Sequence, residues 1–347
     1  MYMAPIKLPA SVLFSATLIM GTIISITSTS WFGAWMGLEI NLLSFIPLMT
    51  NTKNIMSTEA SLKYFLVQAL ASAMLLFSII LTFSLSFYFP SIDPAKYFQY
   101  LIISPLLLKM GAAPFHFWFP GVMEGLSWKN CFILMTWQKI APLMLLSYVI
   151  KMNIFIGMII LLSVVIGSLG GLNQSSLRKL MAYSSINHVG WMIAAMIVGD
   201  NMWELYFLVY SFLSFSILLV FNTHHIFHIN QNFLTMTNNK ITKSCVFLLL
   251  LSLGGLPPFF GFFPKWLIIQ ALAGMNYQFI VVTMVIMTLV TLFYYLRLTF
   301  HAFLFSHTEL KTTPPDNSDS PYFPLILALV GMSTFGLPFS SLIYSML

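Results

Sequence analysis

The chain has 347 residues, of which 15 are lysine or arginine and 9 are aspartate or glutamate, giving a formal net charge of +6. Charged residues make up 7% of the chain, against about 25% in soluble globular domains, and 59% of the residues are apolar. These values exclude a water-soluble fold. The basic residues are scattered singly and form no stripe beside aromatic residues, which argues against a nucleic-acid partner.

Apolar segments longer than about 18 residues recur along the chain and predict an all-α polytopic membrane protein. A β-barrel would need short segments of alternating hydrophobicity instead. About eleven transmembrane helices are predicted, at 8–28, 32–50, 60–89, 99–121, 131–150, 154–172, 180–198, 203–224, 244–271, 277–305 and 322–346. Because eleven is odd, the two termini are expected on opposite sides of the membrane.

The distribution of basic residues predicts the orientation. Only Lys96 and Lys151 fall on the side opposite the N-terminus, so the positive-inside rule puts the N-terminus in the matrix or cytoplasm and the C-terminus outside. The first span is too long for a signal peptide, and we expect it to remain as a membrane helix. The basic residues on the N-terminal side are Lys7, Lys53, Lys63, Lys129, Arg178, Lys179, Lys240, Lys243, Arg297 and Lys311.

Once the charged residues assigned to loops and helix ends are set aside, four remain inside the predicted spans: Glu39, Lys109, Lys139 and Lys265. Each such residue costs about 2.5–3.5 kcal/mol at a helix centre, so we interpret the set as functional. The alternatives are snorkelling of single side chains to the membrane surface and a static ion pair.

Two predicted spans are interrupted by prolines and glycines. The span 99–121 has prolines on both sides of Lys109, and the span 244–271 has the sequence GGLPPFFGFFP immediately before Lys265. Proline removes a helical donor and frees a carbonyl, which within a bilayer must be met by protein or water. Both breaks therefore predict hydrated, protein-lined pockets, with a kinked helix packed on its neighbours as the alternative.

The broken helices are the fourth of helices one to five (8–150) and the fourth of helices six to ten (154–305). Since five is odd, the second set would be an inverted repeat of the first, and 322–346 would be a final helix of the single transmembrane domain 1–347. Broken helices at matching positions of inverted repeats indicate a transport pathway near the membrane midplane. The polar segments 225–243 and 306–321 are too short to fold as domains.

Desolvation disfavours the ammonium form of a lysine, which then releases its proton more readily. We therefore interpret Glu39 and Lys109 as a switch, in which the pair holds a proton and separation lets it pass to Lys139 and on to Lys265. A sodium site would need clustered carboxylates, and Glu39 is the one acid inside the predicted spans once helix-end residues are set aside.

Two histidines, His116 and His188, also fall in the predicted spans and either relay protons or serve as hydrogen-bonded packing residues. The histidine run 224–228 has no carboxylate or cysteine nearby, which favours a hydrated helix end over a metal site. No Gly-rich nucleotide motif, phosphate loop or cysteine cluster is present. We expect no cofactor or metal in this chain, so an ion gradient or a partner subunit must supply the energy.

Five segments match a known family: GLEINLLSFIP (37–47), LLLKMGAAPFHFWFP (106–120), TWQKIAP (136–142), GGLNQSSLRKLMAYSSINHVGW (170–191) and LSLGGLPPFFGFFPKW (251–266). They resemble the antiporter-like chain 2 family of animal mitochondrial NADH:ubiquinone oxidoreductase, respiratory complex I. The resemblance covers essentially the whole chain and weakens in 225–243 and after about residue 305.

The resemblance implies a proton-pumping subunit of the membrane arm in the mitochondrial inner membrane, with its C-terminus in the intermembrane space. It implies that Glu39 is the family's helix-borne glutamate, Lys109 its partner lysine, Lys139 the central lysine and Lys265 the terminal lysine. NADH, FMN, iron–sulfur clusters and ubiquinone would belong to partner subunits. The implied partners are adjacent antiporter-like subunits, accessory subunits and lipids. Bacterial relatives have additional N-terminal helices, and lipid or an accessory subunit would fill the groove that their absence opens.

Three functions remain open at this point. The first is a proton-translocating subunit in which the buried residues form a relay. The second is a scaffold with antiporter-like architecture that transfers no proton itself, and the third is a free-standing cation/proton exchanger. Loss of proton pumping on removal of the titratable groups distinguishes the first from the second, and ion exchange by the purified chain alone identifies the third.

Overall fold

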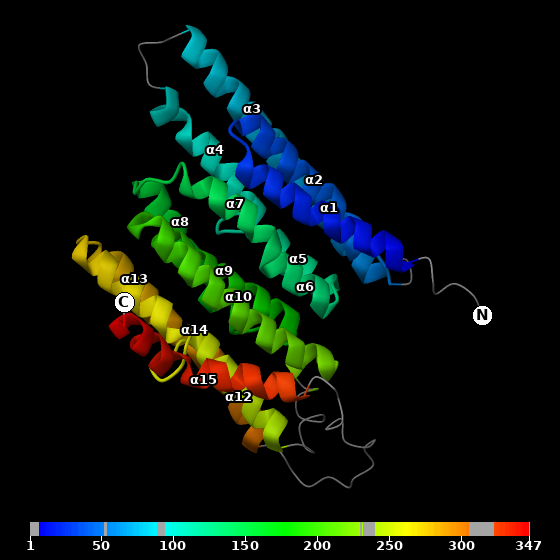
Figure 1. Ribbon diagram of the computed structural model, residues 1–347, viewed down its shortest axis with the longest axis vertical. Coiled ribbons are helices and arrows are strands. Elements are labelled where there is room, and N and C mark those ends of the chain that lie inside the picture. Colours follow the sequence, from blue (N-terminus) through cyan, green and yellow to red (C-terminus); the bar gives the residue numbers. More distant parts are fainter. Residues whose placement is uncertain are drawn as a thin grey trace. The chain divides into compact units, whose positions relative to one another are not determined.

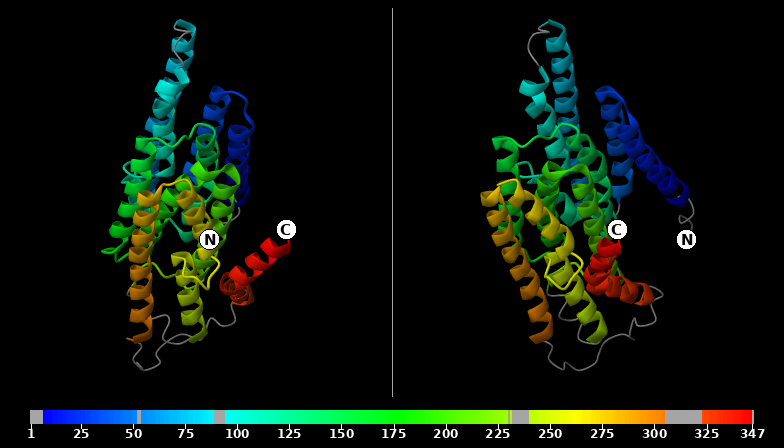
Figure 2. Two further views of the ribbon diagram at one scale, coloured as in Figure 1. Left: turned by 90° about the vertical axis from the view of Figure 1, so that its left-hand side faces the viewer. Right: turned by 60° about the vertical axis from the view of Figure 1, so that its left-hand side comes forward.

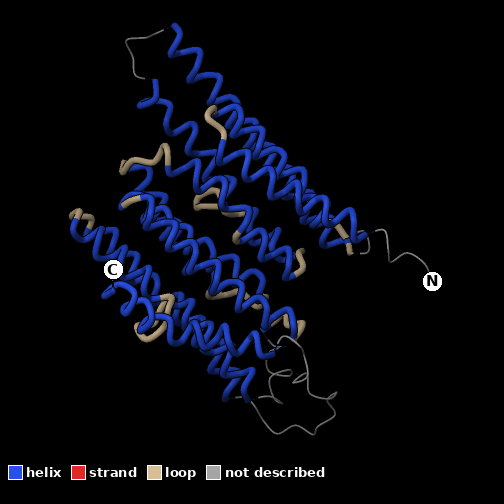
Figure 3. The backbone as a smooth tube through the Cα atoms, viewed as in Figure 1, coloured by secondary structure: helices blue, strands red, loops and turns tan. Residues whose placement is uncertain are grey.

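The computed structural model describes residues 7–51, 54–88, 94–229, 231, 240–304 and 323–346. Lys53, Lys311 and the polar segment 306–321 lie outside these residues. The described residues form helices, shown in blue in Figure 3, and the β-type pairing among them is an isolated bridge between Ser176 and His228. The predicted all-helical class is confirmed.

Unit 1, residues Met1–Met152, is one of two compact units into which the chain divides. Its described helices are α1 (Lys7–Thr27), α2 (Trp31–Met49), α3 (Ile55–Tyr88), α4 (Pro94–Met110), α5 (Trp118–Gly125), α6 (Trp128–Met135) and α7 (Trp137–Ser147). α1 and α2 lie side by side, and α3 packs on α2, α4 and α5 (Figure 1). A Cβ atom at Gly37 would lie 2.5 Å from the backbone nitrogen of Ser25, so glycine permits the close crossing of α1 and α2.

Unit 2 comprises residues Asn153–Leu347. Its described helices are α8 (Ile154–Gly171), α9 (Leu177–Val198), α10 (Asp200–Thr223), α12 (Lys240–Gly254), α13 (Phe262–Gly274), α14 (Gln278–Leu304) and α15 (Phe323–Met346). α9 packs on α8 and α10, and α14, orange in Figure 2, packs on α8 and α12. A Cβ atom at Gly167 would lie 2.5 Å from the backbone nitrogen of Asn187, so a glycine again permits a close helix crossing.

Seven of the described helices are long and apolar enough to cross a membrane: Ala10–Thr27, Trp31–Met49, Ile55–Leu85, Ile154–Gly171, Leu177–Val198, Asp200–Thr223 and Gln278–Phe300. The outward face of α3 exposes large apolar side chains, among them Leu62, Leu66 and Phe77, which suits contact with lipid. The chain is therefore a multi-pass membrane protein. Shorter apolar helices occupy Gln99–Met110, Lys243–Gly254 and Phe323–Pro338, and the count of eleven spans stays a prediction.

The predicted breaks in the fourth and ninth spans are present. α4 and α12 are each followed directly by a glycine in the left-handed conformation, Gly111 at φ 73° and Gly255 at φ 80°. In each case the glycine N–H bonds the carbonyl three residues earlier, and the next N–H bonds the carbonyl five residues before it. This Schellman closure favours a residue without Cβ. The chain becomes helical again at Trp118 and Phe262.

The predicted span 131–150 is divided in the structure, because α6 and α7 are separated at Thr136 (φ −114°, ψ −71°). The Thr136 hydroxyl donates to the Phe132 carbonyl at 2.8 Å, and such bonds bend helices. Pro142 within α7 also withholds an N–H from the helix. Neither signal is as conspicuous in a sequence as the proline and glycine runs at the other two breaks.

Each of the three predicted lysines consequently lies next to a helix end. Lys109 is the penultimate residue of α4, Lys139 lies in the first turn of α7, and Lys265 lies in the first turn of α13. Helix ends leave backbone groups without helical partners, so polar atoms gather around all three lysines.

Candidate functional site

The three lysines are buried within the protein. The exposed fraction is 7% for Lys109, 2% for Lys139 and 5% for Lys265. Snorkelling requires that the end of the side chain reach the membrane surface, so these fractions contradict that alternative. Glu39 on α2 is half-buried.

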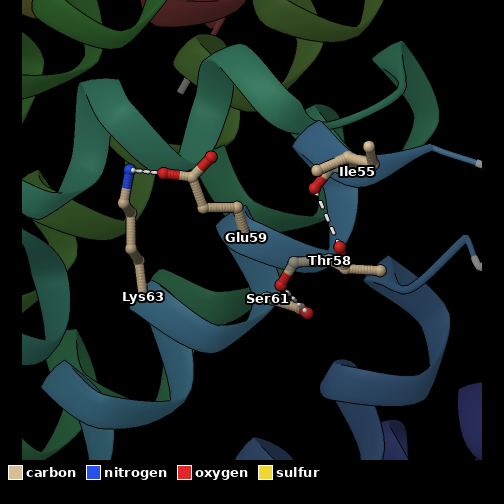
Figure 4. Close-up of polar contacts among 5 residues, drawn as sticks. All are labelled: Ile55, Thr58, Glu59, Ser61 and Lys63. Carbon is tan, nitrogen blue, oxygen red and sulfur yellow. Dashed lines mark hydrogen bonds and ion pairs between the residues drawn. The ribbon is translucent and has the colours of Figure 1, made fainter.

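Lys63 on α3 shows how an ordinary lysine of this chain is placed. Its Nζ lies 2.7 Å from Oε1 of Glu59, one helical turn away, and both side chains are about half exposed (Figure 4). An exposed pair of this kind contributes about 0.3–0.5 kcal/mol. Lys63 therefore serves as a control for the buried lysines.

In unit 1, Lys109 and Lys139 line the same cavity, whose volume is about 20 Å³. A cavity needs about 10–15 Å³ on this measure to hold one water, which then needs two to four polar partners. The lining supplies such partners, because it includes Asn41, Gln68 and Gln138 besides the two lysines. The cavity is thus large and polar enough for one water molecule.

The break after α4 forms one wall of this cavity. Two carbonyls of the last turn of α4 accept hydrogen bonds from side chains: Gln68 Nε2 donates to the Lys109 carbonyl at 3.3 Å, and Trp118 Nε1 donates to the Leu108 carbonyl at 3.1 Å. Protein groups therefore meet carbonyls at this break, as expected within a bilayer.

Lys139 is held against the segment that follows the break. Its Nζ lies 5.1 Å from the centroid of the Phe119 ring, a distance at which a cation attracts the aromatic face. A Cβ atom at Gly111 would lie 3.2 Å from the Cβ of Phe119, so the glycine makes room for this ring. The left-handed turn and the position of Lys139 are thereby connected through Phe119.

A chain of neutral polar side chains links α7 to α2 and α3. Gln138 Nε2 donates to Asn41 Oδ1 at 3.0 Å, and Tyr64 Oη donates to Gln138 Oε1 at 3.4 Å. All three line the cavity. The search for charged residues missed them, although Gln138 directly precedes Lys139 and an amide inside an apolar span is itself a usable signal.

Glu39 and Lys109, both described residues, form no direct ion pair in the structure. His116 lies in the segment between α4 and α5, where its Nδ1 is 3.2 Å from the Pro114 carbonyl and its ring packs on Phe117. The residues that line the cavity in the described part of unit 1 include neither Glu39 nor His116.

In unit 2, Lys265 bridges the break between α12 and α13. Its Nζ donates to the carbonyl of Gly254, the last residue of α12, at 2.8 Å. A Cβ atom at Gly255 would lie 2.9 Å from this Nζ, so the left-handed glycine also makes space for the ammonium group. The Nζ lies 5.9 Å from the centroid of the Trp191 ring.

His188 is buried on α9, with 5% of its surface exposed. Its Nδ1 lies 2.8 Å from the hydroxyl oxygen of Tyr206 on α10. The ring of Tyr206 is parallel to that of Trp191, with an interplanar angle of 3° and centroids 6.4 Å apart. Side-chain contacts thus run from Lys265 through Trp191 and Tyr206 to His188, and neither aromatic residue was predicted from the sequence.

Comparison with known proteins identifies the family. A family model described as NADH:quinone oxidoreductase/Mrp antiporter, TM, matches residues 28–291. The chain is 54% identical to NADH-ubiquinone oxidoreductase chain 2 of Anopheles gambiae over 96% of this chain and 97% of that protein. It is likewise 54% identical to that of Aedes aegypti, over 96% and 98%. The chain belongs to the NADH-ubiquinone oxidoreductase chain 2 family.

The fold of this chain 2 family member is also found in a solved structure. Respiratory complex I from Thermus thermophilus contains a chain that matches with a TM-score of 0.80 and 24% identity, covering 94% of this chain and 78% of that one. At this identity the match shows a shared fold. The resemblance of the sequence to an antiporter-like family is confirmed by the family model and the chain 2 relatives.

Proposed function

We propose that this chain is a proton-translocating subunit of the membrane arm of respiratory complex I in the mitochondrial inner membrane. Membership of the NADH-ubiquinone oxidoreductase chain 2 family supports this assignment. NADH oxidation and ubiquinone reduction would proceed in partner subunits, which hold FMN and the iron–sulfur clusters. The observation that most directly supports proton transfer by this chain is the cavity shared by Lys109 and Lys139.

The proposed relay consists of Glu39, Lys109, Lys139 and Lys265. In unit 1 the Lys109 ammonium gives a proton to a water in the cavity, and that water gives a proton to the neutral Lys139 amine. The polar lining and the volume of the cavity support this step. His116 and His188 are secondary members of the proposed relay.

Helix α2 is the proposed control element of unit 1. It bears Glu39, whose carboxylate attracts the Lys109 ammonium, and Asn41, which bonds Gln138 beside Lys139. A displacement of α2 would therefore change the surroundings of both lysines together. Separation of Glu39 from Lys109 would release the proton toward Lys139.

We also propose eleven spans in two inverted five-helix repeats and a final helix, with the N-terminus in the matrix. The asymmetry of basic residues and the like closure of α4 and α12 at Gly111 and Gly255 support this topology. The proposed partners are neighbouring antiporter-like subunits, accessory subunits and membrane lipids.

Replacing Lys109 by methionine tests the proposed function. Methionine keeps an unbranched side chain of similar size and removes the ammonium group, so packing is retained while the proton carrier is lost. We expect the ratio of protons translocated to NADH oxidised to fall by the number of protons that this chain normally translocates. The measurement is lumenal acidification in vesicles that contain the assembled variant complex.

The matched control is Lys63→Met, which removes an exposed ammonium from α3 and should leave the ratio unchanged. An unchanged ratio in the Lys109→Met complex would instead identify the chain as a scaffold. In that case only substitutions that disturb helix packing should affect the enzyme, through its assembly.

Replacing Gln138 by leucine should slow proton transfer in unit 1 about tenfold or more, because an apolar wall disfavours water in a small cavity. It also leaves the Asn41 amide and the Tyr64 hydroxyl without this partner, at about 1–3 kcal/mol. We expect a high-resolution map of the native complex to show a water within reach of Lys109 and Lys139, and that of Gln138→Leu to lack it. The same water in both maps, with unchanged pumping, would refute the role of Gln138.

A further inference from the structure

Unit 2 contains a buried histidine whose ring nitrogen Nδ1 contacts a tyrosine hydroxyl. His188 Nδ1 and Tyr206 Oη are 2.8 Å apart, and the two residues are 5% and 2% exposed. Imidazole has two nitrogens that exchange donor and acceptor roles with the tautomer, whereas a phenol hydroxyl both donates and accepts. Tyr206 therefore keeps its bond to Nδ1 whether that nitrogen carries a proton or not.

Tyr206 also contacts the surroundings of Lys265. Its ring is stacked on Trp191, and the Trp191 ring centroid is 5.9 Å from the Lys265 Nζ. Stacked aromatic pairs with centroids up to about 7 Å apart attract each other, as do a cation and an aromatic face within about 6 Å. Tyr206 is thus connected to Lys265 through the Trp191 ring.

We propose that Tyr206 is the positioning residue of the second unit, which orients the His188 ring through its hydroxyl and relates that orientation to Lys265 through its stacking on Trp191. The inference rests on the proposed function and goes beyond it by assigning a role to a residue that does not itself gain or lose a proton. His188 takes up and releases the proton, and Tyr206 remains a neutral phenol throughout.

Three arguments favour this role over simple packing. A buried phenol hydroxyl needs a hydrogen-bond partner, and here the partner is itself a buried titratable side chain, His188. The ring of Tyr210 lies 4.8 Å from that of His188, which limits the imidazole to a narrow range of orientations. Proton transfer depends on donor and acceptor geometry, so a small rotation of the imidazole has a large effect on rate.

The experiment uses the assembled complex with Tyr206→Phe, which removes one oxygen atom and keeps the ring that stacks on Trp191. We expect proton transfer at His188 to become about tenfold slower. The number of protons translocated per NADH oxidised, normalised to the amount of assembled complex, should fall as a result. The matched control is Tyr294→Phe, another fully buried tyrosine of unit 2, whose ring packs on Tyr295. This control should pump like the native complex.

A double variant separates positioning from structure. If Tyr206 acts through His188, its hydroxyl has no further effect once His188 is replaced. The double variant Tyr206→Phe, His188→Gln should then pump no worse than His188→Gln alone. Additive effects, normal pumping by Tyr206→Phe, or failure of Tyr206→Phe to assemble would each overturn the proposal. Normal pumping by Lys109→Met would instead overturn the proposed function, so the two failures are distinguishable.

Discussion

Replacement of Lys139 by methionine is expected to stop proton transfer through this chain while leaving its fold intact. Lys139 is among the largest fully buried side chains, with 2% of its surface exposed, and it shares the cavity with Lys109. A proton donor or acceptor placed in a reaction path contributes about a hundredfold or more to the rate. Methionine fills a similar volume, so the cost of a cavity that alanine would leave is avoided.

The measurement is the rate of lumenal acidification in vesicles containing the variant complex, compared at equal NADH oxidation. Lys63→Met provides the exposed control on α3, and Lys139→Arg provides a charged side chain that does not release its proton. We expect Lys139→Arg to fail as Lys139→Met does. Pumping at the native rate in either Lys139 variant would show that protons bypass this residue.

Replacement of Gly261 by alanine is expected to prevent the complex from accumulating. The added Cβ would overlap the carbonyl oxygen of Ser252 and lie 3.1 Å from Leu213 Cδ1. That same carbonyl accepts the N–H of Gly255 in the closure of α12, so it has little freedom to move. Overpacking against backbone costs about 3 kcal/mol, a large part of the stability of a typical domain.

The control for this variant lies on the helix that follows, since nothing approaches within 4 Å of a Cβ at Gly274. Gly274→Ala should assemble normally. The amount of assembled complex on a native gel distinguishes the two variants. If Gly261→Ala reached the native amount, the segment between α12 and α13 would have to be less tightly packed than the structure shows.

The apolar spans and the two breaks at proline and glycine could be predicted from the sequence, because hydrocarbon tolerates few charges and few free carbonyls. The same reasoning identified Lys109 and Lys139, which the structure brings to one cavity. Their burial follows from the free-energy cost of exposing an ammonium group to lipid. This cost can be estimated from the sequence alone, because the sequence shows which lysines fall inside apolar spans.

The neutral polar partners could not be predicted in this way. Asn41 and Gln138 are far apart in sequence, and an amide in an apolar span gives a much weaker signal than a charge. The separation of α6 from α7 depends on a threonine hydroxyl that bonds its own helix, a local choice that sequence patterns do not determine. The stacking of Tyr206 on Trp191 requires the packing of α9 on α10.

The position of Lys139 and Lys265 in the first turn of a short helix has a mechanical consequence. The helices that carry them follow a break and are 11 residues long in α7 and 13 in α13. A short rod joined to its neighbour by a turn can tilt while its internal backbone bonds stay intact, whereas tilting the middle of an unbroken helix strains several of them. Segmented rods allow an ammonium group to swing by an ångström or two at low elastic cost, the scale of movement that separates a made hydrogen bond from a broken one.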